Sequence, residues 1–366
     1  MAFKILTVVG TRPNFIKVTQ FGACLNDPDA GLEHRLLHTG QHYDEKMSKI
    51  FFEQFQLQPD FWLNVPPGTP NTQIAHTMIG IEQVMQEQYR PDLLMVVGDV
   101  NSTLAAALTA NKMGVPIAHV ESGLRSQDRT MPEEINRILT DEIADYCLVT
   151  EQSGLDNLTK EGKQQDRIAF VGNTMIDTLV AFETSIQASG IQGELGVEAG
   201  NYALMTMHRP ATVDHRDGLE KLIEVLRLLA PMCPLVFSIH PRTMNNLKKF
   251  DLERIIRAIP QLILAGPMDY FSFQKLVSDA RFVITDSGGI QEETTFLRVP
   301  CLTLRANTER PSTTVMGTNT LAPFEPDAIL QLTGDIVRGS YKSGAIPPKW
   351  DGKATQRIAE FVKTLL

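Results

Sequence analysis

Cysteine is scarce in this chain of 366 residues, and its cysteines have no metal-binding spacing. The four cysteines are Cys24, Cys147, Cys233 and Cys301. No Cys-x-x-Cys pair occurs among them, which argues against a zinc site. Scattered thiols fit a reducing compartment. We therefore expect a cytoplasmic protein that holds no metal.

The sequence also lacks long apolar runs and an excess of positive charge. No apolar run approaches the roughly 20 residues that cross a bilayer. The first residues lead into an apolar strand without the basic flank of a signal peptide. The net charge is −9, whereas nucleic-acid binding normally needs a basic face. We expect neither a membrane nor a nucleic acid as partner.

Short apolar runs rich in Val, Ile and Leu alternate with longer amphipathic stretches. This rhythm is typical of buried parallel strands that alternate with helices. The runs are 5–9, 35–38, 93–97, 117–120, 147–149, 168–171, 203–207, 235–239, 262–265, 282–285 and 301–304. The runs therefore predict an α/β protein. Because the chain of 366 residues exceeds a usual domain of about 100 to 200 residues, we expect two doubly wound, Rossmann-like domains.

A Gly-rich, weakly patterned stretch at 185–201 separates the two sets of runs. We expect the hinge within or beside it. The first domain then comprises residues 1–185 and the second residues 186–349. Ligands of open α/β sheets bind at the carboxyl ends of the strands, so we expect the ligand between the domains.

One candidate phosphate-binding turn follows the first predicted strand, at residues 10–17. Gly10 and Pro13 shape a tight turn into a helix. Arg12 and Lys17 would stand near the helix N-terminus, where free backbone N–H groups attract anions. These two cations predict a diphosphate clamp, and an ordinary turn with solvated bases is the alternative.

A second candidate turn follows a strand in the other half of the chain. Asp286, Ser287, Gly288 and Gly289 can open a helix with exposed amides. Glu293 lies one turn into that helix, where it could accept hydrogen bonds from ribose hydroxyls. A simple helix cap is the alternative, but two such turns, one in each half, favour phosphate binding.

Acidic residues close or follow three strands of the first half. They are Asp99, Glu121, and the neighbours Glu133 and Glu134. Like charges gathered at the mouth of a sheet raise each other's pKa, which suits a carboxylate to proton transfer at neutral pH. The alternative for Glu134 is an ion pair with Arg125 or Arg137.

A histidine and several arginines follow strands of the second half. His208 and Arg209 end the first of these strands. Beside the Ser-Gly-Gly turn, His208 is a candidate phosphate ligand or leaving-group acid, although a structural role is the alternative. Arg242 follows the next strand as either a second contact or part of a turn, and two more arginines lie in residues 305–311.

A set of short motifs occurs in a fixed order along nearly the whole chain. They are GTRPNFIK, TGQHYD, GDVNST, HVESGLRS, MPEEINR, VGNTMIDT, HRP, SIHPRT, TDSGGIQEE, NTERP, GTNT and WDGKATQRI. Together they closely resemble the UDP-N-acetylglucosamine 2-epimerase family. The resemblance implies a GT-B fold whose last helix, residues 350–366, crosses back to the first domain. It also implies a homodimer, a UDP-sugar substrate, and a reaction that uses no nicotinamide, metal or other cofactor.

The resemblance further implies roles for single residues. Those that match catalytic positions are Asp99, Glu121, Glu133, His208 and Lys17. Those implied to bind the substrate or UDP are Arg12, Arg137, Arg209, Arg242, Ser287, Gly288, Gly289, Glu293, Thr308, Glu309 and Arg310. Among these, the Ser-Gly-Gly turn matches the diphosphate site and Glu293 the ribose-binding carboxylate.

Two segments depart from the family pattern. The best-known bacterial members follow the histidine with Arg-x-Glu-Asn, whereas this chain has Arg209-Pro210-Ala211-Thr212. Members regulated by a second substrate molecule carry Gln-His-x-Gln, whereas this chain has Gln41-His42-Tyr43-Asp44. We therefore do not expect the allosteric site.

The implied activity is interconversion of UDP-N-acetylglucosamine and UDP-N-acetylmannosamine, by anti elimination of UDP to 2-acetamidoglucal and re-addition. Within the same class, the alternatives are a hydrolysing 2-epimerase that releases N-acetylmannosamine and UDP, or a 2-epimerase of a UDP-2,3-diacetamido sugar. A GT-B glycosyltransferase is a different catalytic class. A nucleotide-sugar-binding module is the non-enzymatic alternative, and the intact set of carboxylates and histidine argues against it.

Overall fold

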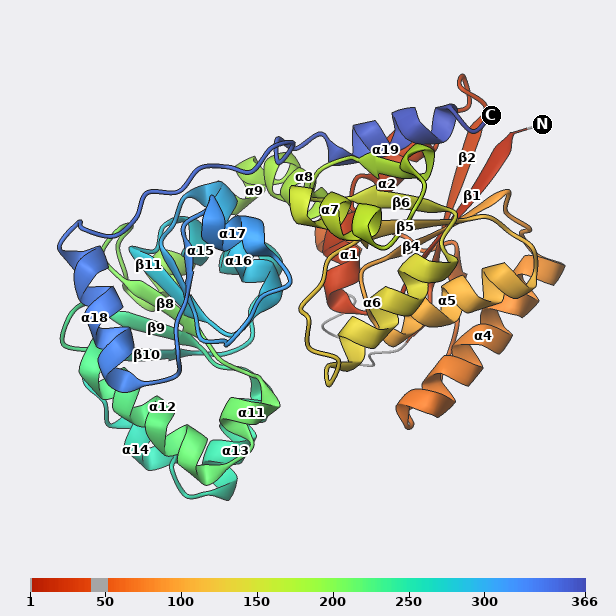
Figure 1. Cartoon of the computed structure of the whole chain (residues 1–366). Helices are drawn as coiled ribbons and strands as arrows, with labels where there is room; N and C mark the ends of the chain where they lie inside the picture. Colours follow the sequence, from red (N-terminus) through yellow and green to blue (C-terminus); the bar gives the residue numbers. More distant parts are fainter. Residues whose placement is uncertain (1, 41–51) are drawn as a thin grey trace. The chain divides into compact units, whose positions relative to one another are not determined.

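The structure, a computed structural model, describes residues 2–40 and 52–366, except for the side chain of Arg12. The chain divides into two compact units (Figure 1). Unit 1 comprises Met1–Ala181 and Pro348–Leu366, and unit 2 comprises Phe182–Pro347. No helix in the described part of the chain is long and apolar enough to cross a membrane.

Unit 1 is built on a seven-stranded parallel sheet with the order β3-β2-β1-β4-β5-β6-β7. Its strands are β1 (Phe3–Val9), β2 (Leu32–His38), β3 (Phe61–Trp62), β4 (Leu93–Val97), β5 (Ile117–Ser122), β6 (Tyr146–Val149) and β7 (Ile168–Phe170). The chain starts in the middle of the sheet and winds outward to both edges. This is the doubly wound arrangement that the sequence predicted.

Unit 2 repeats this arrangement with a six-stranded parallel sheet, in the order β10-β9-β8-β11-β12-β13. Its strands are β8 (Ala203–Thr206), β9 (Leu235–Ser238), β10 (Leu262–Ala265), β11 (Phe282–Thr285), β12 (Cys301–Thr303) and β13 (Asn319–Leu321). Every predicted apolar run forms a strand, which confirms the predicted α/β fold class. The two strands that the sequence analysis missed, β3 and β13, lie at sheet edges and are too short to form an apolar run.

Burial of both faces explains why the strands are continuous apolar runs rather than alternating ones. In β1, Leu6 and Val8 belong to one hydrophobic core, and Ile5 and Val9 belong to another on the opposite face. Successive side chains of a strand point to opposite faces. Both faces of β1 are therefore covered, as is usual for parallel sheets.

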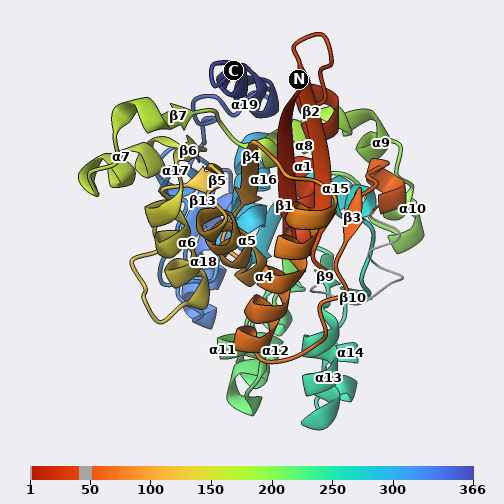
Figure 2. The same ribbon diagram turned by 90° about the vertical axis from the view of Figure 1, so that its right-hand side faces the viewer.

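Helices of unit 1 supply these two cores. They are α1 (Arg12–Val18), α2 (Phe21–Leu25), α4 (Pro70–Glu87), α5 (Asn101–Lys112), α6 (Pro132–Ile143), α7 (Gln152–Lys160), α8 (Thr174–Ala181) and α19 (Ala354–Lys363), with a 3-10 turn at Gln165–Arg167. Helices α4 and α5 pack against each other, as both views show (Figures 1 and 2). Ile81 of α4 and Ala106 of α5 are fully buried against one face of the sheet.

Unit 2 contains the remaining helices. They are α9 (Glu183–Gln187), α10 (Ile191–Leu195), α11 (Pro210–Val213), α12 (Arg216–Leu229), α13 (Pro241–Lys249), α14 (Glu253–Arg257), α15 (Tyr270–Ser278), α16 (Gly288–Leu297), α17 (Pro311–Val315) and α18 (Pro326–Val337). The stretch 185–201, within or beside which the sequence predicted the hinge, contributes to α9 and forms α10. Its Ile191 and Val197 are buried in a core of unit 2, so this stretch is a packed part of that unit.

The last helix, α19, closes one face of the unit 1 sheet (Figure 1). Its Ile358 and Val362 are fully buried in the same core as Ile5. The buried carboxylate of Asp177 accepts hydrogen bonds from the backbone N–H groups of Ala354 and Thr355, at 3.0 and 2.6 Å. One side chain of α8 therefore satisfies donors at the start of α19, which backbone geometry leaves without intrahelical partners.

We expect Asp177→Ala to weaken the docking of α19. The substitution leaves buried donors without acceptors, which costs about 1 to 3 kcal/mol of unfolding free energy. Trp350 is 1% exposed beside α19, and Trp62, the other tryptophan, is 51% exposed. Denaturant unfolding followed by Trp350 fluorescence in a Trp62→Phe background measures the loss.

The matched control is Asp351→Ala, which removes a more exposed carboxylate paired with Arg357. We expect this control to cost about 0 to 1 kcal/mol, because exposed ion pairs contribute little. Equal losses in the two variants would show that the cap on α19 does not hold the helix.

Candidate functional site

Some of the predicted site residues of each unit follow the strands at which the strand order of its sheet reverses. This switch point falls between β1 and β4 in unit 1, and between β8 and β11 in unit 2. Asp99 follows β4, His208 follows β8, and Ser287 follows β11. Ligands of open α/β sheets bind at this position, so both groups occupy favourable places in their own sheets.

A buried ion pair lies at the switch point of unit 1. The Nζ atom of Lys17 is 2.5 Å from Oε2 of Glu121, and their side chains are 7% and 3% exposed. The other carboxylate oxygen, Oε1, is buried and has no hydrogen-bond partner among the described residues. Buried carboxylate oxygens are normally hydrogen-bonded. Glu121 therefore has one oxygen held by a cation and one uncommitted.

The backbone of Glu121 is also unusual. Its φ is +70°, a left-handed conformation that non-glycine residues rarely adopt. The pairing of β5 with β6 shifts register between Val120 and Ser122, on either side of it. Such a bulge re-aims a side chain, and the conformation costs about 1 to 3 kcal/mol. Strain of this kind persists where the surrounding structure fixes it, and it is common at active sites.

Gly98 allows β4 to approach this ion pair closely. Its φ is +70°, and a Cβ atom at this position would lie 3.1 Å from Nζ of Lys17. Asn14 of α1 braces the same corner, because its Nδ2 donates to the carbonyl of Val97 at 2.8 Å. Its Oδ1 accepts from both N–H and hydroxyl of Thr11. The sequence analysis did not single out Asn14, whose function depends on contacts between separate elements.

Arg137 of α6 joins two of the predicted acidic residues. Its guanidinium is almost fully buried and forms ion pairs with Asp99 and Glu134. Glu134 also accepts the N–H groups of Ser126 and Gln127. The alternative interpretation of Glu134, an ion pair with Arg125 or Arg137, is thus confirmed for Arg137. Arg137 is occupied by carboxylates rather than available as a free cation.

The remaining predicted carboxylate, Glu133, is exposed at the start of α6, whereas Asp99 is 23% exposed and Glu121 is buried. The three predicted catalytic carboxylates therefore have different environments. Glu121 lies against Lys17, Asp99 against Arg137, and Glu133 in the first turn of a helix. Two of the three, Glu121 and Asp99, are each paired with a buried cation.

The first predicted phosphate clamp differs from the expectation. Lys17 lies in the last turn of α1, not near its N-terminus, and its charge is paired with Glu121. Arg12 begins α1, and its side chain lies outside the described part of the chain. The segment 41–44, which the sequence analysis compared with an allosteric motif, also lies outside the described residues.

In unit 2, His208 is oriented by a buried carboxylate. Its Nδ1 lies 2.9 Å from Oδ1 of Asp286, whose side chain is fully buried. The other oxygen of Asp286 accepts the backbone N–H groups of His208 and Arg209. Burial opposes ionisation of Asp286, but the hydrogen bonds and charge of His208 and these amides lower its pKa. From the sequence, Asp286 was predicted as part of a phosphate-binding turn or as a helix cap, and its contact with His208 was not expected.

The Ser-Gly-Gly turn opens a helix as predicted. Ser287 is the N-cap residue of α16, whose first residue is Gly288. The first N–H groups of a helix have no intrahelical partner, so this end attracts anions. A Cβ atom on Gly288 would lie 2.9 Å from a guanidinium nitrogen of Arg310 and 3.0 Å from a carboxylate oxygen of Glu309. Glycine at this position therefore lets two charged side chains approach the helix start.

Most arginines predicted to bind the ligand are engaged within unit 2. Arg310 pairs with Glu292 and Glu309, and Arg305 also pairs with Glu309. Separately, Arg209 donates to the carbonyl of Asp286, Arg242 pairs with Asp214, and Thr308 donates to Gln291. Glu293 is buried, 3% exposed, in α16. The Ser-Gly-Gly turn at the start of α16 is thus surrounded by arginines that are paired with carboxylates, and not by free cations.

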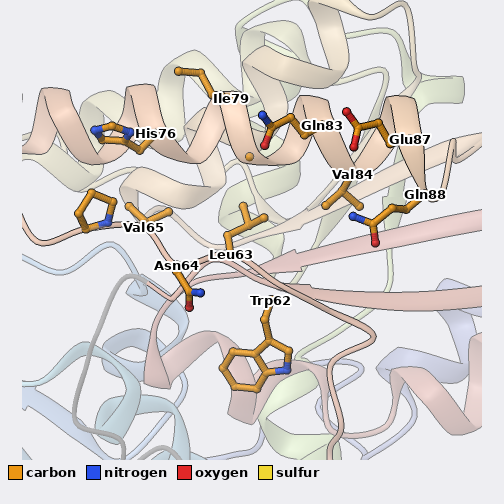
Figure 3. A pocket seen from close by; sticks show the side chains of 12 residues that line it. Trp62, Leu63, Asn64, Val65, His76, Ile79, Gln83, Val84, Glu87 and Gln88 are labelled. Carbon is orange, nitrogen blue, oxygen red and sulfur yellow. The ribbon is translucent and has the colours of Figure 1, made fainter.

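A separate hollow in unit 1 contains none of the predicted site residues. It has a volume of about 370 Å³ and lies between α4 and residues 62–66. Figure 3 shows Trp62 and Asn64 on one side, with His76, Gln83 and Glu87 on the helix. We assign no chemistry to it. Among the described residues there is also no cluster of three or more His, Cys, Asp or Glu side chains that could hold a metal.

Comparisons with known proteins give consistent results. A family model described as UDP-N-acetylglucosamine 2-epimerase matches residues 26–363. The UDP-N-acetylglucosamine 2-epimerase of Methanocaldococcus jannaschii is 36% identical over 365 residues, covering 98% of each chain. The UDP-2,3-diacetamido-2,3-dideoxy-D-glucuronate 2-epimerase of Pseudomonas aeruginosa is 35% identical over 373 residues, covering 99% of this chain and 100% of the relative.

A solved structure is similar over the same length. It is the crystal structure of the M. jannaschii enzyme in complex with UDP-GlcNAc and UDP, and its TM-score with this structure is 0.89 at 36% identity. The match covers 99% of this chain and 100% of that chain. The likeness therefore extends over both units.

We expect Asp286→Asn to destabilise unit 2 in a pH-dependent manner. The folded-state pKa of Asp286 is lowered, so its ionised form stabilises the fold above the unfolded-state pKa of about 3.9. This contribution is lost as the pH falls through the lower folded pKa. At pH 7 the variant should lose about 1.5 to 3 kcal/mol of unfolding free energy, the range for hydrogen bonds to charged groups.

Denaturant unfolding of both proteins at neutral pH and near pH 3 measures this difference, which should shrink in acid. Asp335→Asn, which removes a partly exposed partner of Arg338 in the same unit, should change stability by about 0 to 1 kcal/mol. A difference between wild type and Asp286→Asn that does not vary with pH would contradict an ionised Asp286.

Proposed function

The chain belongs to the UDP-N-acetylglucosamine 2-epimerase family and is an epimerase of GT-B fold, and we propose that it interconverts UDP-N-acetylglucosamine and UDP-N-acetylmannosamine. The observation that carries this proposal is the carboxylate of Glu121. It is buried at a switch point, with one oxygen held by Lys17 and the other without a partner in the part of the chain that the structure describes. Such a group is prepared to exchange a proton with a substrate.

The substrate's chemistry explains why proton removal must be coupled to loss of UDP. The hydrogen on C2 is not acidified by a neighbouring carbonyl, so its direct removal at neutral pH would be slow. In the proposed step a carboxylate takes the C2 proton as the C1–O bond breaks. A C1=C2 double bond forms, and UDP leaves with the bonding electrons. Return of a proton to the opposite face, and of UDP to C1, yields the epimer.

We assign the proton transfers to unit 1. Glu121 is the proposed proton acceptor for one face of C2, because its Oε1 is uncommitted. Asp99 is the proposed partner for the other face, since it is partly exposed and follows Gly98, which lies against Glu121. Glu133 matches the family's third catalytic carboxylate. Because Glu133 is exposed, we assign neither proton transfer at C2 to it.

We assign the binding of UDP to unit 2. The amides at the start of α16 would hold the diphosphate, and Glu293 would accept hydrogen bonds from the ribose. His208 would stabilise the negative charge that grows on the leaving diphosphate, and Asp286 would keep its ring in place. Donors arranged in advance for such charge are effective, and removing one costs about 2.7 to 4 kcal/mol of transition-state stabilisation.

A related sugar is the second candidate substrate. The similarity to the P. aeruginosa relative, which is named for a UDP-2,3-diacetamido sugar, is nearly as high as that to the M. jannaschii enzyme. The hydrolysing reaction is the other alternative, because the same carboxylates could form the glycal in both. The homodimer implied by the resemblance stays a prediction.

An NMR time course in deuterium oxide tests the proposed reaction. With UDP-N-acetylglucosamine as substrate, we expect deuterium at C2 of the epimerised product, because the proton that returns comes from an exchangeable carboxyl group. UDP should remain attached to most of the product. Epimerisation without deuterium uptake would contradict this mechanism.

The same time course separates the alternatives. Free N-acetylmannosamine that accumulates in step with UDP would identify the hydrolysing reaction. If UDP-N-acetylglucosamine is unchanged while a UDP-2,3-diacetamido sugar gains deuterium at C2, that sugar is the substrate. The absence of reaction with either would favour a glycosyltransferase.

Glu121→Gln should abolish proton transfer while leaving UDP binding intact. Removal of a general base typically costs about 10²- to 10⁴-fold in kcat. Glu121→Asp keeps the negative charge beside Lys17 but shortens the side chain, so its loss of kcat cannot be attributed to an unpaired buried cation. Both rates are measured with the deuterium assay, and UDP binding by calorimetry.

The matched control is Glu142→Gln, since Glu142 is an exposed carboxylate of α6 in the same unit. This variant should react like the wild type. Deuterium exchange at the wild-type rate in both Glu121 variants would move the assignment of the base to another carboxylate.

A further inference from the structure

A fully buried histidine lies two residues before Glu121 and has hydrogen bonds at both ring nitrogens. Nε2 of His119 is 2.8 Å from the carbonyl oxygen of Gly98, and Nδ1 is 2.7 Å from Oδ1 of Asp141. Both side chains are almost completely excluded from solvent. The sequence analysis assigned no role to either residue, and the proposed reaction does not use them.

The partners of His119 determine where its protons lie. A carbonyl oxygen can only accept, so Nε2 carries a proton. At Nδ1, a proton must also lie between the ring and the carboxylate, because two lone pairs at 2.7 Å would repel. Burial opposes ionisation of Asp141, but the charge and hydrogen bond of His119, with Arg125 and the N–H of Gly123, lower its pKa. Both ring nitrogens of His119 can donate at the same time only in the imidazolium form.

The surrounding charges would balance a cation at this buried position. Asp141 also accepts Arg125 at 2.6 Å, and Arg125 pairs with Glu161 at 2.7 Å, whose side chain is 46% exposed. With His119 as an imidazolium, two positive and two negative groups alternate from this residue to the surface. Burial and the nearby Asp141 raise the pKa of the Cys147 thiol to about 12, so this neighbour stays neutral. A buried charge is stable only with such partners.

His119 and Asp141 hold the backbone around Glu121 from both sides. His119 fixes the carbonyl of Gly98, the residue before Asp99. Asp141 accepts the N–H of Gly123 at 2.9 Å, two residues beyond Glu121. These bonds tie β4, β5 and α6 together where Glu121 adopts its left-handed conformation. Strained backbone persists only when its surroundings determine it.

We propose that His119 is a positioning residue, an imidazolium that, with Asp141, holds Glu121 and Asp99 in their reactive geometry. The inference rests on the proposed function for the meaning of that geometry, but not for the charge of His119. A shift of about 1 Å in a reacting group can cost about 100-fold in rate. The residue does not touch the substrate, so its removal should lower kcat with little change in KM.

Nitrogen-15 NMR of the wild-type histidines tests the charge directly. Both ring nitrogens of His119 should show protonated shifts at pH 7. His34 provides an internal reference in the same sheet, because burial lowers its pKa to about 4, so it should show the neutral pattern. A neutral tautomer of His119 at pH 7 would overturn the proposal, whatever the enzyme's activity.

His119→Gln tests the positioning role. Glutamine can donate to Gly98 or to Asp141 but carries no charge, so we expect kcat to fall about 10- to 100-fold. KM should change less than about threefold, and amide exchange at Gly123 should accelerate. Wild-type kcat in a folded variant would overturn the proposal, and so would a loss confined to KM.

The matched control is His34→Gln, which removes a part-buried histidine bonded to Thr7 at 2.8 Å, outside the site. Its thermal stability should fall while kcat is retained. If both variants lose kcat in proportion to stability, His119 acts only through folding, and the proposal fails. If wild-type protein does not epimerise the sugar, the proposed function fails. The NMR and amide-exchange results still test the charge of His119 and its role in holding the backbone.

Discussion

The reversal of strand order in each parallel sheet is the constraint on which the rest of the structure depends. Parallel strands covered on both faces leave only their ends open to a ligand, and neighbouring loops diverge where the order reverses. In unit 1 this position brings Gly98 beside the Lys17–Glu121 pair. In unit 2 it brings His208 beside the first residues after β11. Chemistry-bearing side chains are thus gathered by topology rather than by sequence proximity.

Buried charges at these positions are held in fixed partnerships. Removal of a charged group from water is costly unless another charge and hydrogen bonds compensate. Glu121 has Lys17, Asp99 and Glu134 share Arg137, and similar pairs surround the start of α16. The geometry of a reactive carboxylate is therefore set by its partner. Oε1 of Glu121, which has no hydrogen-bond partner among the described residues, is the atom to which we assign proton transfer.

Two histidines illustrate how one residue type serves different purposes. His208 is partly exposed, and one nitrogen faces Asp286, so the other remains to meet a ligand. His119 is fully buried, and both nitrogens are committed to Asp141 and Gly98. The first geometry suits binding and proton donation, whereas the second suits a fixed charge that holds the backbone. Sequence position after or within a strand does not distinguish these roles.

The sequence determined the fold class, because burial of a strand on both faces requires a continuous apolar run that is visible in the residues themselves. It also located the helix that opens at Ser287, since glycine and an N-cap residue act locally. It did not reveal β3 and β13, whose two and three residues form strands only through pairing at an edge.

The charge partners were decided by tertiary structure alone. Lys17 and Glu121 are 104 positions apart, so nothing local joins them. His119 and Asp141, 22 positions apart, meet because β5 and α6 pack together. The polar stripe of Glu134, Arg137 and Asp141 on the buried side of α6 was the available signal. Helical spacing places those residues on one face, but only the packed sheet determines which charges they meet.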